Sequence, residues 1–195
     1  MSRSDPAAAK KERNKTIRWV VTIFFITILV SGVISLLSDY IMSISGIVVA
    51  FLILLVIILI GIVFDIVGVA VASADEKPFH SMAARKVPGA QDAIKLLRNA
   101  ERVSSICNDV IGDICGVVSG SASATIAAQV LHYFSFGWPQ IVGLVMSALV
   151  AGMTVGGKAI GKTFAMNSST AIISFVGRVL YFIHHPSRIF AKKKI

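Results

Sequence analysis

The sequence predicts an all-α membrane protein with about four transmembrane helices and additional amphipathic helices at the membrane surface. Three observations lead to this class. Apolar residues make up 55% of the 195 residues, and the mean hydropathy of the chain is +0.81. Several apolar runs reach the roughly 20 residues that a helix needs to cross about 30 Å of hydrocarbon. The 19 Lys and Arg residues fall into three segments, which are separated each time by two apolar runs.

The basic N-terminal segment, residues 1–18, leads into the first apolar run. We expect this cytoplasmic segment to lack fixed structure, because it is polar and strongly charged. A first span is expected at residues 19–37, with Trp19 as an anchor at the membrane interface. The run is too long for the apolar part of a signal peptide, and no cleavage motif of small residues follows it, so we expect it to be retained. Residues 38–46 are expected to form a short polar turn.

Three further spans complete the expected transmembrane domain, residues 19–165. The second span is placed at residues 47–74, and a basic cytoplasmic linker separates it from the third span at residues 104–131. Residues 132–139 form a turn that is rich in aromatic side chains, as an interfacial belt would be. The fourth span is placed at residues 140–157.

Two amphipathic helices are expected outside the spans. One lies in the basic linker, residues 75–103, where apolar and basic residues occupy opposite faces of a helix. The other lies in the juxtamembrane tail, residues 166–195, where apolar residues recur at helical spacing. A fifth span in the tail is the alternative. It would export the three lysines at positions 192–194, so an interfacial helix is favoured.

The distribution of positive charge predicts the topology. Six Lys and Arg precede the first span, six lie in the linker and seven follow the fourth span, whereas the two short turns carry none. By the positive-inside rule, both termini and the linker are expected on the cytoplasmic side of an integral, multi-pass protein of the cell membrane. Topology and contact with membrane lipids explain the net charge of +9, and nucleic acid is not an expected partner.

Three carboxylates inside the expected spans are the strongest functional signal. Asp65 lies in the second span, and Asp109 and Asp113 lie in the third. Each costs about 2.5–3.5 kcal/mol at a helix centre on insertion scales, so we expect each to face protein or water. Asp65 and Asp113 lie at similar distances from the cytoplasmic ends of their spans, which places both at a depth of about 13 Å.

Other polar and small residues accompany these carboxylates. The two carboxylates of the third span share a helix face beside Asn108, and Gly112 belongs to a stripe of small residues in the same helix. Carboxylate, amide and main-chain oxygens are the ligands of a hard cation such as Mg²⁺, so an ion site or a proton relay is one interpretation. A structural polar cluster, with Lys158 or Lys162 as counterion, is the other.

The remaining candidates for chemistry are weak. Cys107 and Cys115 lie in an apolar segment at a spacing that matches no metal motif, and we interpret them as small packing residues. Two glycine pairs, at positions 152 and 156 and at positions 157 and 161, are interpreted as packing faces that could serve a dimer interface. No nucleophile lies at a recognisable spacing from a base, so an enzyme is not expected.

Four short motifs occur in an order that is typical of one membrane family. Residues 157–165 (G-K-A-I-G-K-T-F-A) are similar to the pattern G-E-x-x-P-K-T-x-A, and residues 93–102 (A-I-K-L-L-R-N-A-E-R) to A-x-x-L-L-x-x-P-E-R. Residues 70–73 (A-V-A-S) are similar to A-L-F-S, and Gly112 with Asp113 stands near the place of a G-N pair. Together they resemble the transmembrane domain of the CNNM/CorB/CorC magnesium transporters, over roughly residues 47–190.

The resemblance implies a homodimer and a magnesium site between the spans, formed in that family by serine and asparagine side chains with main-chain carbonyls. Ser73 loosely matches the serine, and Asp113 stands near the place of an asparagine. Lys158 replaces the family's glutamate, Gly161 replaces its proline, and Gly68 stands where an acidic residue is usual. We expect neither the CBS pair nor the CorC regulatory domain of that family, so regulation would require a separate cytoplasmic partner.

The functional hypothesis is transport or binding of a divalent cation, Mg²⁺ first, by alternating exposure of one site. The expected metal-site residues are Asp65, Ser73, Asn108, Asp109, Gly112 and Asp113. The alternative is a non-transporting membrane scaffold or accessory subunit, in which the polar cluster only fixes helix packing. A lipid-active enzyme is the third possibility, and it lacks a nucleophile–base pair.

Overall fold

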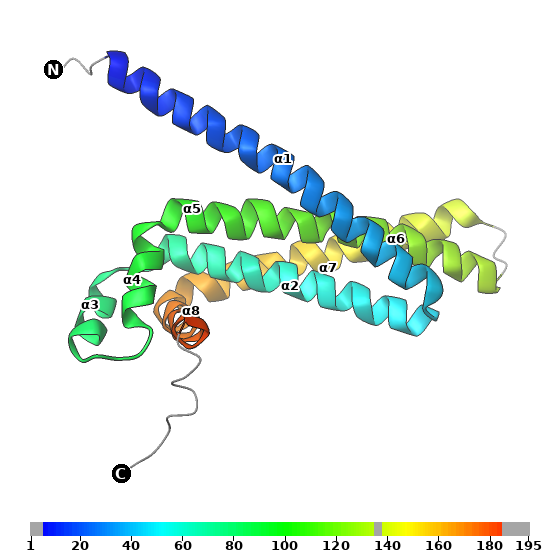
Figure 1. The fold of residues 1–195 in the computed structure, drawn as a ribbon. Helices are drawn as coiled ribbons and strands as arrows, with labels where there is room; N and C mark the ends of the chain where they lie inside the picture. The colour runs from blue at the N-terminus through cyan, green and yellow to red at the C-terminus, as the bar shows by residue number, and fades with distance from the viewer. Residues whose placement is uncertain (1–5, 135–137, 185–195) are drawn as a thin grey trace, which may run out of the picture.

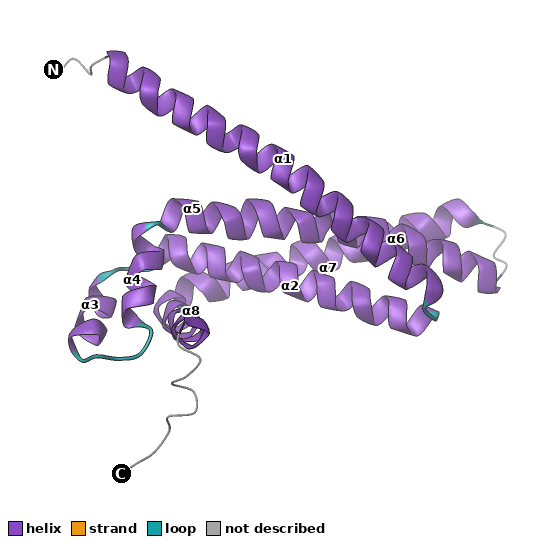
Figure 2. Cartoon of the chain, viewed as in Figure 1, coloured by secondary structure: helices purple, strands orange, loops and turns teal. Residues whose placement is uncertain are grey.

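The computed structural model describes residues 6–134 and 138–184, and all regular structure in these residues is helical (Figures 1 and 2). Four helices in this part of the chain are long and apolar enough to cross a membrane: Asn14–Ile44, Ile47–Ser73, Ala100–Tyr133 and Pro139–Asn167. The predicted class, an all-α membrane protein with four transmembrane helices, is therefore confirmed.

The first helix, α1 (Pro6–Ile44), is longer at both ends than the sequence predicted. The expectation of an unstructured segment before Trp19 is wrong from Pro6 onward, because Ala, Lys, Glu and Arg favour a helix and nothing between them ends it. The expected turn at residues 38–46 is helical as far as Ile44, and the chain reverses only at Ser45 and Gly46.

Three helices form the bundle against which α1 leans. They are α2 (Ile47–Ser73), the rod made by α5 (Ala100–Ser105), η1 (Ile106–Gly112) and α6 (Asp113–Phe134), and α7 (Pro139–Asn167). α2, α6 and α7 pack against one another, and α1 packs against α6. α1 meets the bundle at the turn end, where it joins α2, and diverges from it toward the other end (Figure 1).

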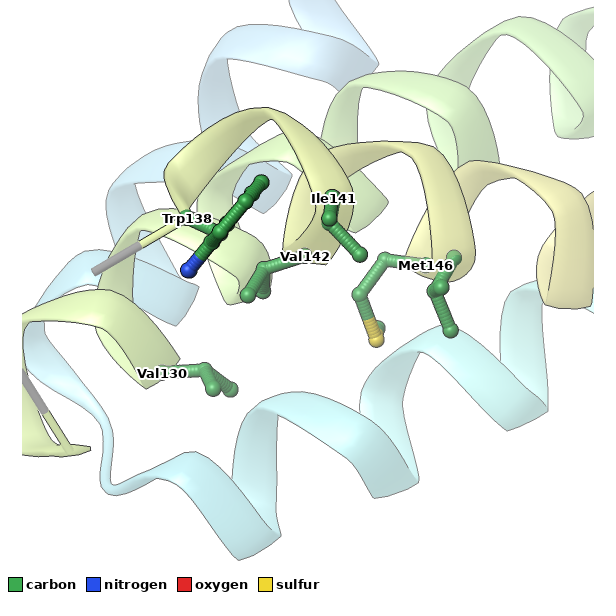
Figure 3. Close-up of a pocket in the computed structure, with 6 residues that line it drawn as sticks. Val130, Trp138, Ile141, Val142 and Met146 are labelled. Carbon is green, nitrogen blue, oxygen red and sulfur yellow. The ribbon is translucent and has the colours of Figure 1, made fainter. Parts of the chain in front are cut away.

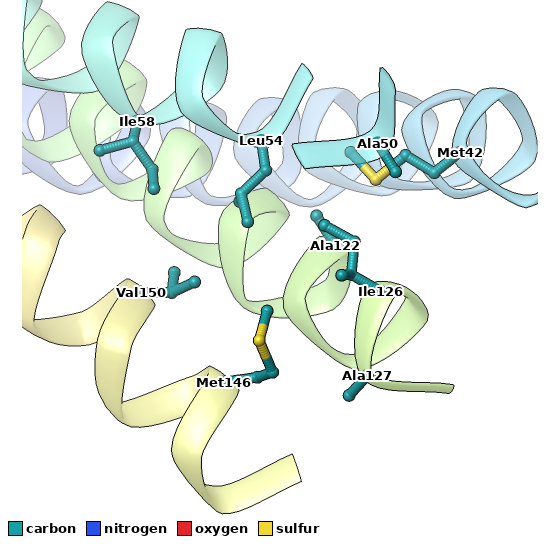
Figure 4. Close-up of a cluster of buried hydrophobic side chains, with 9 residues drawn as sticks. All are labelled: Met42, Ala50, Leu54, Ile58, Ala122, Ile126, Ala127, Met146 and Val150. Carbon is teal, nitrogen blue, oxygen red and sulfur yellow. The ribbon is translucent and has the colours of Figure 1, made fainter. Parts of the chain in front are cut away.

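The core of the turn end contains small and large apolar side chains from all four long helices (Figure 4). Alanines at positions 50, 122 and 127 are at most 5% exposed. Small residues at helix crossings let the backbones approach closely, which supplies the packing energy that holds helices together in lipid. The other members of this core are Met42, Leu54, Ile58, Ile126, Met146 and Val150.

Shorter helices close the opposite end, which we call the capped end. These are α3 (Lys77–Ala84), α4 (Ala90–Arg98) and α8 (Ser169–His184). α8 is seen end-on in Figure 1 whereas the long helices run across the view, so it crosses the direction of the bundle. Gly89, at φ +85°, and Gly177 let α4 and α8 touch through their backbones, since a Cβ on Gly177 would lie 2.6 Å from the Gly89 carbonyl oxygen. The sequence predicted the helices α4 and α8 and did not predict α3.

Candidate functional site

The buried carboxylate of Asp65 lies where α2, η1 and α7 meet. Asp65 is 4% exposed, and its Oδ1 lies 3.8 Å from Nζ of Lys158 on α7. Gly157 and Gly161 allow this approach, because a Cβ at either position would collide with Ile62 or Ile66 of α2. The glycines that flank Lys158 therefore bring its ammonium to Asp65.

Gly112, the last residue of η1, faces this ion pair. A Cβ on Gly112 would lie 3.3 Å from Nζ of Lys158 and 3.9 Å from Oδ1 of Asp65. A side chain at Gly112 would therefore crowd the ammonium. Of the six predicted site residues, Asp65 and Gly112 are thus brought together.

Asn108 lies on the same side of η1, one turn from Gly112. Its side chain fills the space beside Gly68 of α2, where a Cβ would overlap Oδ1 of Asn108. The amide Nδ2 donates a hydrogen bond to Oγ of Ser104 at 3.3 Å. Gly68 therefore has a packing role in this chain: it makes room for an amide from the facing helix.

Two buried oxygens on this seam between α2 and η1 lack a hydrogen-bond donor within the described residues. They are Oδ2 of Asp65 and Oδ1 of Asn108. Asp65 faces Gly112, and Asn108 faces Gly68, which follows Asp65 by three residues in α2, so Asp65 and Asn108 lie roughly 4.5 Å apart along the seam. An unsatisfied buried acceptor costs about 1–3 kcal/mol, so a hydrogen-bond donor or a cation placed between these two oxygens would stabilise the seam.

The other predicted carboxylates point elsewhere. Asp109 and Asp113 are both exposed, and Asp109 accepts a hydrogen bond of 2.8 Å from Oγ of Ser105. Asp113 follows Gly112, which faces Asp65, but Asp109 and Asp113 lie on a different face of the helix from Asn108 and Gly112. In residues 6–134 and 138–184 no three His, Cys, Asp or Glu side chains gather into a group that could hold a metal ion.

The two remaining candidates lie away from Asp65. Ser73 ends α2 and is exposed, eight residues beyond Asp65, which is about 12 Å along the helix. Lys162, the second candidate counterion, is also exposed. Lys158 is therefore the lysine that faces the buried carboxylate.

A cavity of about 420 Å³ opens beside Asn108 at the capped end. Its walls contain the carboxylates of Glu101 and Asp109, and none of the described Lys and Arg side chains lines it. Asn108 thus forms the boundary between an acidic cavity and the buried seam. The other lining residues are Ala72, Ala100, Ser104 and Ser105.

A second cavity, of about 540 Å³, lies at the turn end (Figure 3). The lining side chains are apolar apart from the indole nitrogen of Trp138. Its described lining offers no side-chain oxygen to a cation and suits hydrocarbon. The lining residues are Val130, Trp138, Ile141, Val142, Val145 and Met146.

Sequence reasoning missed a polar contact that joins α1 to α6. Asp39 accepts hydrogen bonds from Oγ of Ser121 at 2.7 Å and from Oγ1 of Thr125 at 3.2 Å. One turn further, Nε2 of Gln129 donates to the Met42 carbonyl at 2.6 Å. A signal was present in the sequence: positions 121, 125 and 129 are polar at spacings of four in an apolar helix, which indicates a polar partner.

Comparison of the chain with protein-family models, with curated proteins and with solved structures finds no match.

Proposed function

We propose that this chain binds or transports a divalent cation across a membrane, with Mg²⁺ as the first candidate. The observation that carries the proposal is the pair of buried, unpartnered oxygens of Asp65 and Asn108 among the described residues. Carboxylate and amide oxygens are ligands of hard cations, and Mg²⁺ keeps several waters while it is held by one or two protein oxygens. Asp65 and Asn108 would be the protein ligands.

The acidic cavity is the proposed entrance to the site. Glu101 and Asp109 give its wall negative charge, which raises the local concentration of cations. In our proposal Asp109 attracts the ion at this entrance, Asn108 passes it to the seam, and Asp65 holds it there. Asp113 and Ser73 receive no ligand role, because both are exposed outside the seam.

The proposed orientation follows from the charge distribution. With all 19 Lys and Arg outside the two short turns, the positive-inside rule puts the capped end and both termini in the cytoplasm and gives four crossings of the cell membrane. The acidic cavity would then open to the cytoplasm. A homodimer is part of the proposal, since a second copy could cover the exposed Asp113 that lipid would not tolerate. A separate regulatory partner could bind at the capped end.

Flux of Mg²⁺ into vesicles that contain the purified protein tests this function. Asp65→Asn removes the charge of the proposed ligand at constant volume, and we expect it to reduce the flux by at least about tenfold, equivalent to about 1.4 kcal/mol. Asp113→Asn is the matched control, because it removes an equally deep carboxylate outside the seam, and it should keep most of the flux. Equal flux in the wild type and in Asp65→Asn would rule out the site.

A non-transporting scaffold or accessory subunit is the second candidate, and the Asp65–Lys158 ion pair favours it. The pair neutralises the buried carboxylate without an added ion. The scaffold predicts that Asp65→Asn lowers the unfolding temperature and that Mg²⁺ does not raise the unfolding temperature of the wild type. A ligand at 100 times its Kd should raise the stability by about 2.7 kcal/mol, so thermal unfolding with and without Mg²⁺ separates the two candidates.

A further inference from the structure

A lysine ammonium lies beside Asp65, one of the two residues of the proposed cation site. Nζ of Lys158 lies 3.8 Å from Oδ1 of Asp65 and beside Gly112, where a Cβ would lie 3.3 Å from it. The Asp65 side chain is 6% exposed and that of Lys158 is 21% exposed. The positive charge that balances Asp65 is therefore supplied from within the chain.

The contact between these two groups is electrostatic and leaves one carboxylate oxygen unused. A separation of 3.8 Å is longer than the 2.7–3.2 Å of a hydrogen bond between nitrogen and oxygen. Oδ2 of Asp65 lacks any donor in the described part of the chain. The ammonium thus balances the charge of the carboxylate but donates no hydrogen bond to it. Asp65 therefore remains available to a ligand that binds it directly.

The ammonium and a divalent cation cannot share this space. Asp65 and Lys158 together carry no net charge, and an added divalent ion would leave two positive charges in excess within a few ångströms. Repulsion at such distances is strong where water is excluded. Binding of the ion therefore requires the ammonium to leave.

The Lys158 side chain is not fully enclosed. Its side chain is one-fifth exposed, and α7 continues past it toward the capped end, where Lys162 is exposed one turn further along. Long lysine side chains extend along apolar surface to place the ammonium in water. Rotation of the Lys158 side chain toward the capped end would free Asp65 while α2 and α7 stay packed.

We propose that Lys158 is a tethered cation that competes with the divalent ion for Asp65. In the protein without Mg²⁺, the Lys158 ammonium balances the charge of the buried Asp65 carboxylate. It lowers the affinity of the site for Mg²⁺, because the ion must displace the ammonium before it binds. This inference rests on the proposed cation site and adds a residue that sets the affinity of that site.

Calorimetric titration of Mg²⁺ into the full-length protein in lipid nanodiscs tests the competition. Lys158→Met keeps the length of the side chain and removes its charge, and we expect Mg²⁺ to bind at least about tenfold more tightly to it than to the wild type. Lys162→Met removes a lysine one turn away and should leave the affinity unchanged. If Lys158→Met does not yield folded protein, Lys158→Gln, which removes the charge and keeps a polar end group, serves the same test.

Thermal unfolding gives a second readout. Without Mg²⁺, Lys158→Met should unfold at a lower temperature than the wild type, because Asp65 is left unpaired, and Asp65→Asn with Lys158→Met should recover part of the loss. Mg²⁺ should raise the unfolding temperature of Lys158→Met more than that of the wild type.

The two proposals fail in different ways. If the wild type binds Mg²⁺, Asp65→Asn does not, and Lys158→Met binds no more tightly than the wild type, the competition is overturned and the cation site stands. If neither the wild type nor Lys158→Met binds Mg²⁺, the cation site itself is overturned, and the competition with it.

Discussion

Glycines line both helices that enclose Asp65. Gly61 faces Cys115, Gly68 faces Asn108, and Gly112 faces the ion pair. At each of these positions a Cβ would lie against a side chain of the facing helix. The position of Asn108 and of the Lys158 ammonium is therefore set by missing side chains on the opposite surface.

Gly68→Ala tests this role at the seam. The added Cβ overlaps Oδ1 of Asn108, so the amide must leave the seam, and we expect the protein to lose about 1–3 kcal/mol of stability. The unfolding temperature in detergent measures the loss. Gly143→Ala is the control, because no described atom lies within 4 Å of its new Cβ, and it should not lower the stability, since Ala favours a helix more than Gly does. An unchanged unfolding temperature in Gly68→Ala would show that Asn108 does not occupy this space.

At the residue scale, the sequence predicted which side chains are chemically unusual and did not predict which of them meet. Asp65, Asn108 and Gly112 were singled out and lie on one seam, while Asp109 and Asp113 were expected to join them and are exposed. The difference is which face of the helix packs: Asn108 and Gly112, four residues apart, face α2 and the ion pair. Asp109 and Asp113 each follow one residue later, about 100° further around the helix, and the periodicity of the sequence does not show which of these two faces is buried.

Among the elements, α1 depends most on a few polar contacts. Its most apolar 18 residues include none that is buried, and it diverges from the bundle toward the capped end (Figure 1). Near the turn end, Asp39 accepts hydrogen bonds from Ser121 and Thr125. These bonds, with the core around Met42, hold α1 to α6.

A double-mutant cycle on Asp39 and Ser121 measures that attachment. We expect Asp39→Ala to lower the stability by about 1–3 kcal/mol, because two hydroxyl groups lose a charged acceptor. The coupling energy between Asp39→Ala and Ser121→Ala should be about 0.5–2 kcal/mol. Ser43→Ala is a matched control, because that hydroxyl donates to the Tyr40 carbonyl of its own helix. A coupling energy near zero would show that the contact does not hold α1.

Hydropathy located the long helices well and located their ends less well. The second span was predicted at residues 47–74, and α2 covers Ile47–Ser73. The predicted first span ended too early, because Ser38 and Asp39 are polar and indicated a turn. In the structure they continue the helix, and Ser121 of α6 donates a hydrogen bond to the Asp39 carboxylate. α3 was missed because Lys77–Ala84 is short, and its one buried side chain, Phe79, packs against residues distant in the sequence.

For the molecule as a whole, the proposed orientation can be tested by labelling single cysteines in intact cells. In a background with Cys107→Ala and Cys115→Ala, we expect Ser43→Cys at the turn end to react with a membrane-impermeant reagent. Ser81→Cys, in α3 at the capped end, should react only after the cells are opened. Both serines are exposed, so access to the side chain is not limited by packing. The reverse pattern would place the acidic cavity outside the cell.

The Asp65–Lys158 pair carries no net charge, and this determines how membrane voltage would act on the proposed Mg²⁺ transporter. Moving one elementary charge through 100 mV changes the free energy by about 2.3 kcal/mol. If the pair stays together while the empty carrier reorients, no net charge crosses the field, and the return step proceeds at a rate that is independent of voltage. The electrical driving force would then act on the loaded carrier alone, and currents recorded at different potentials would report ion entry and exit.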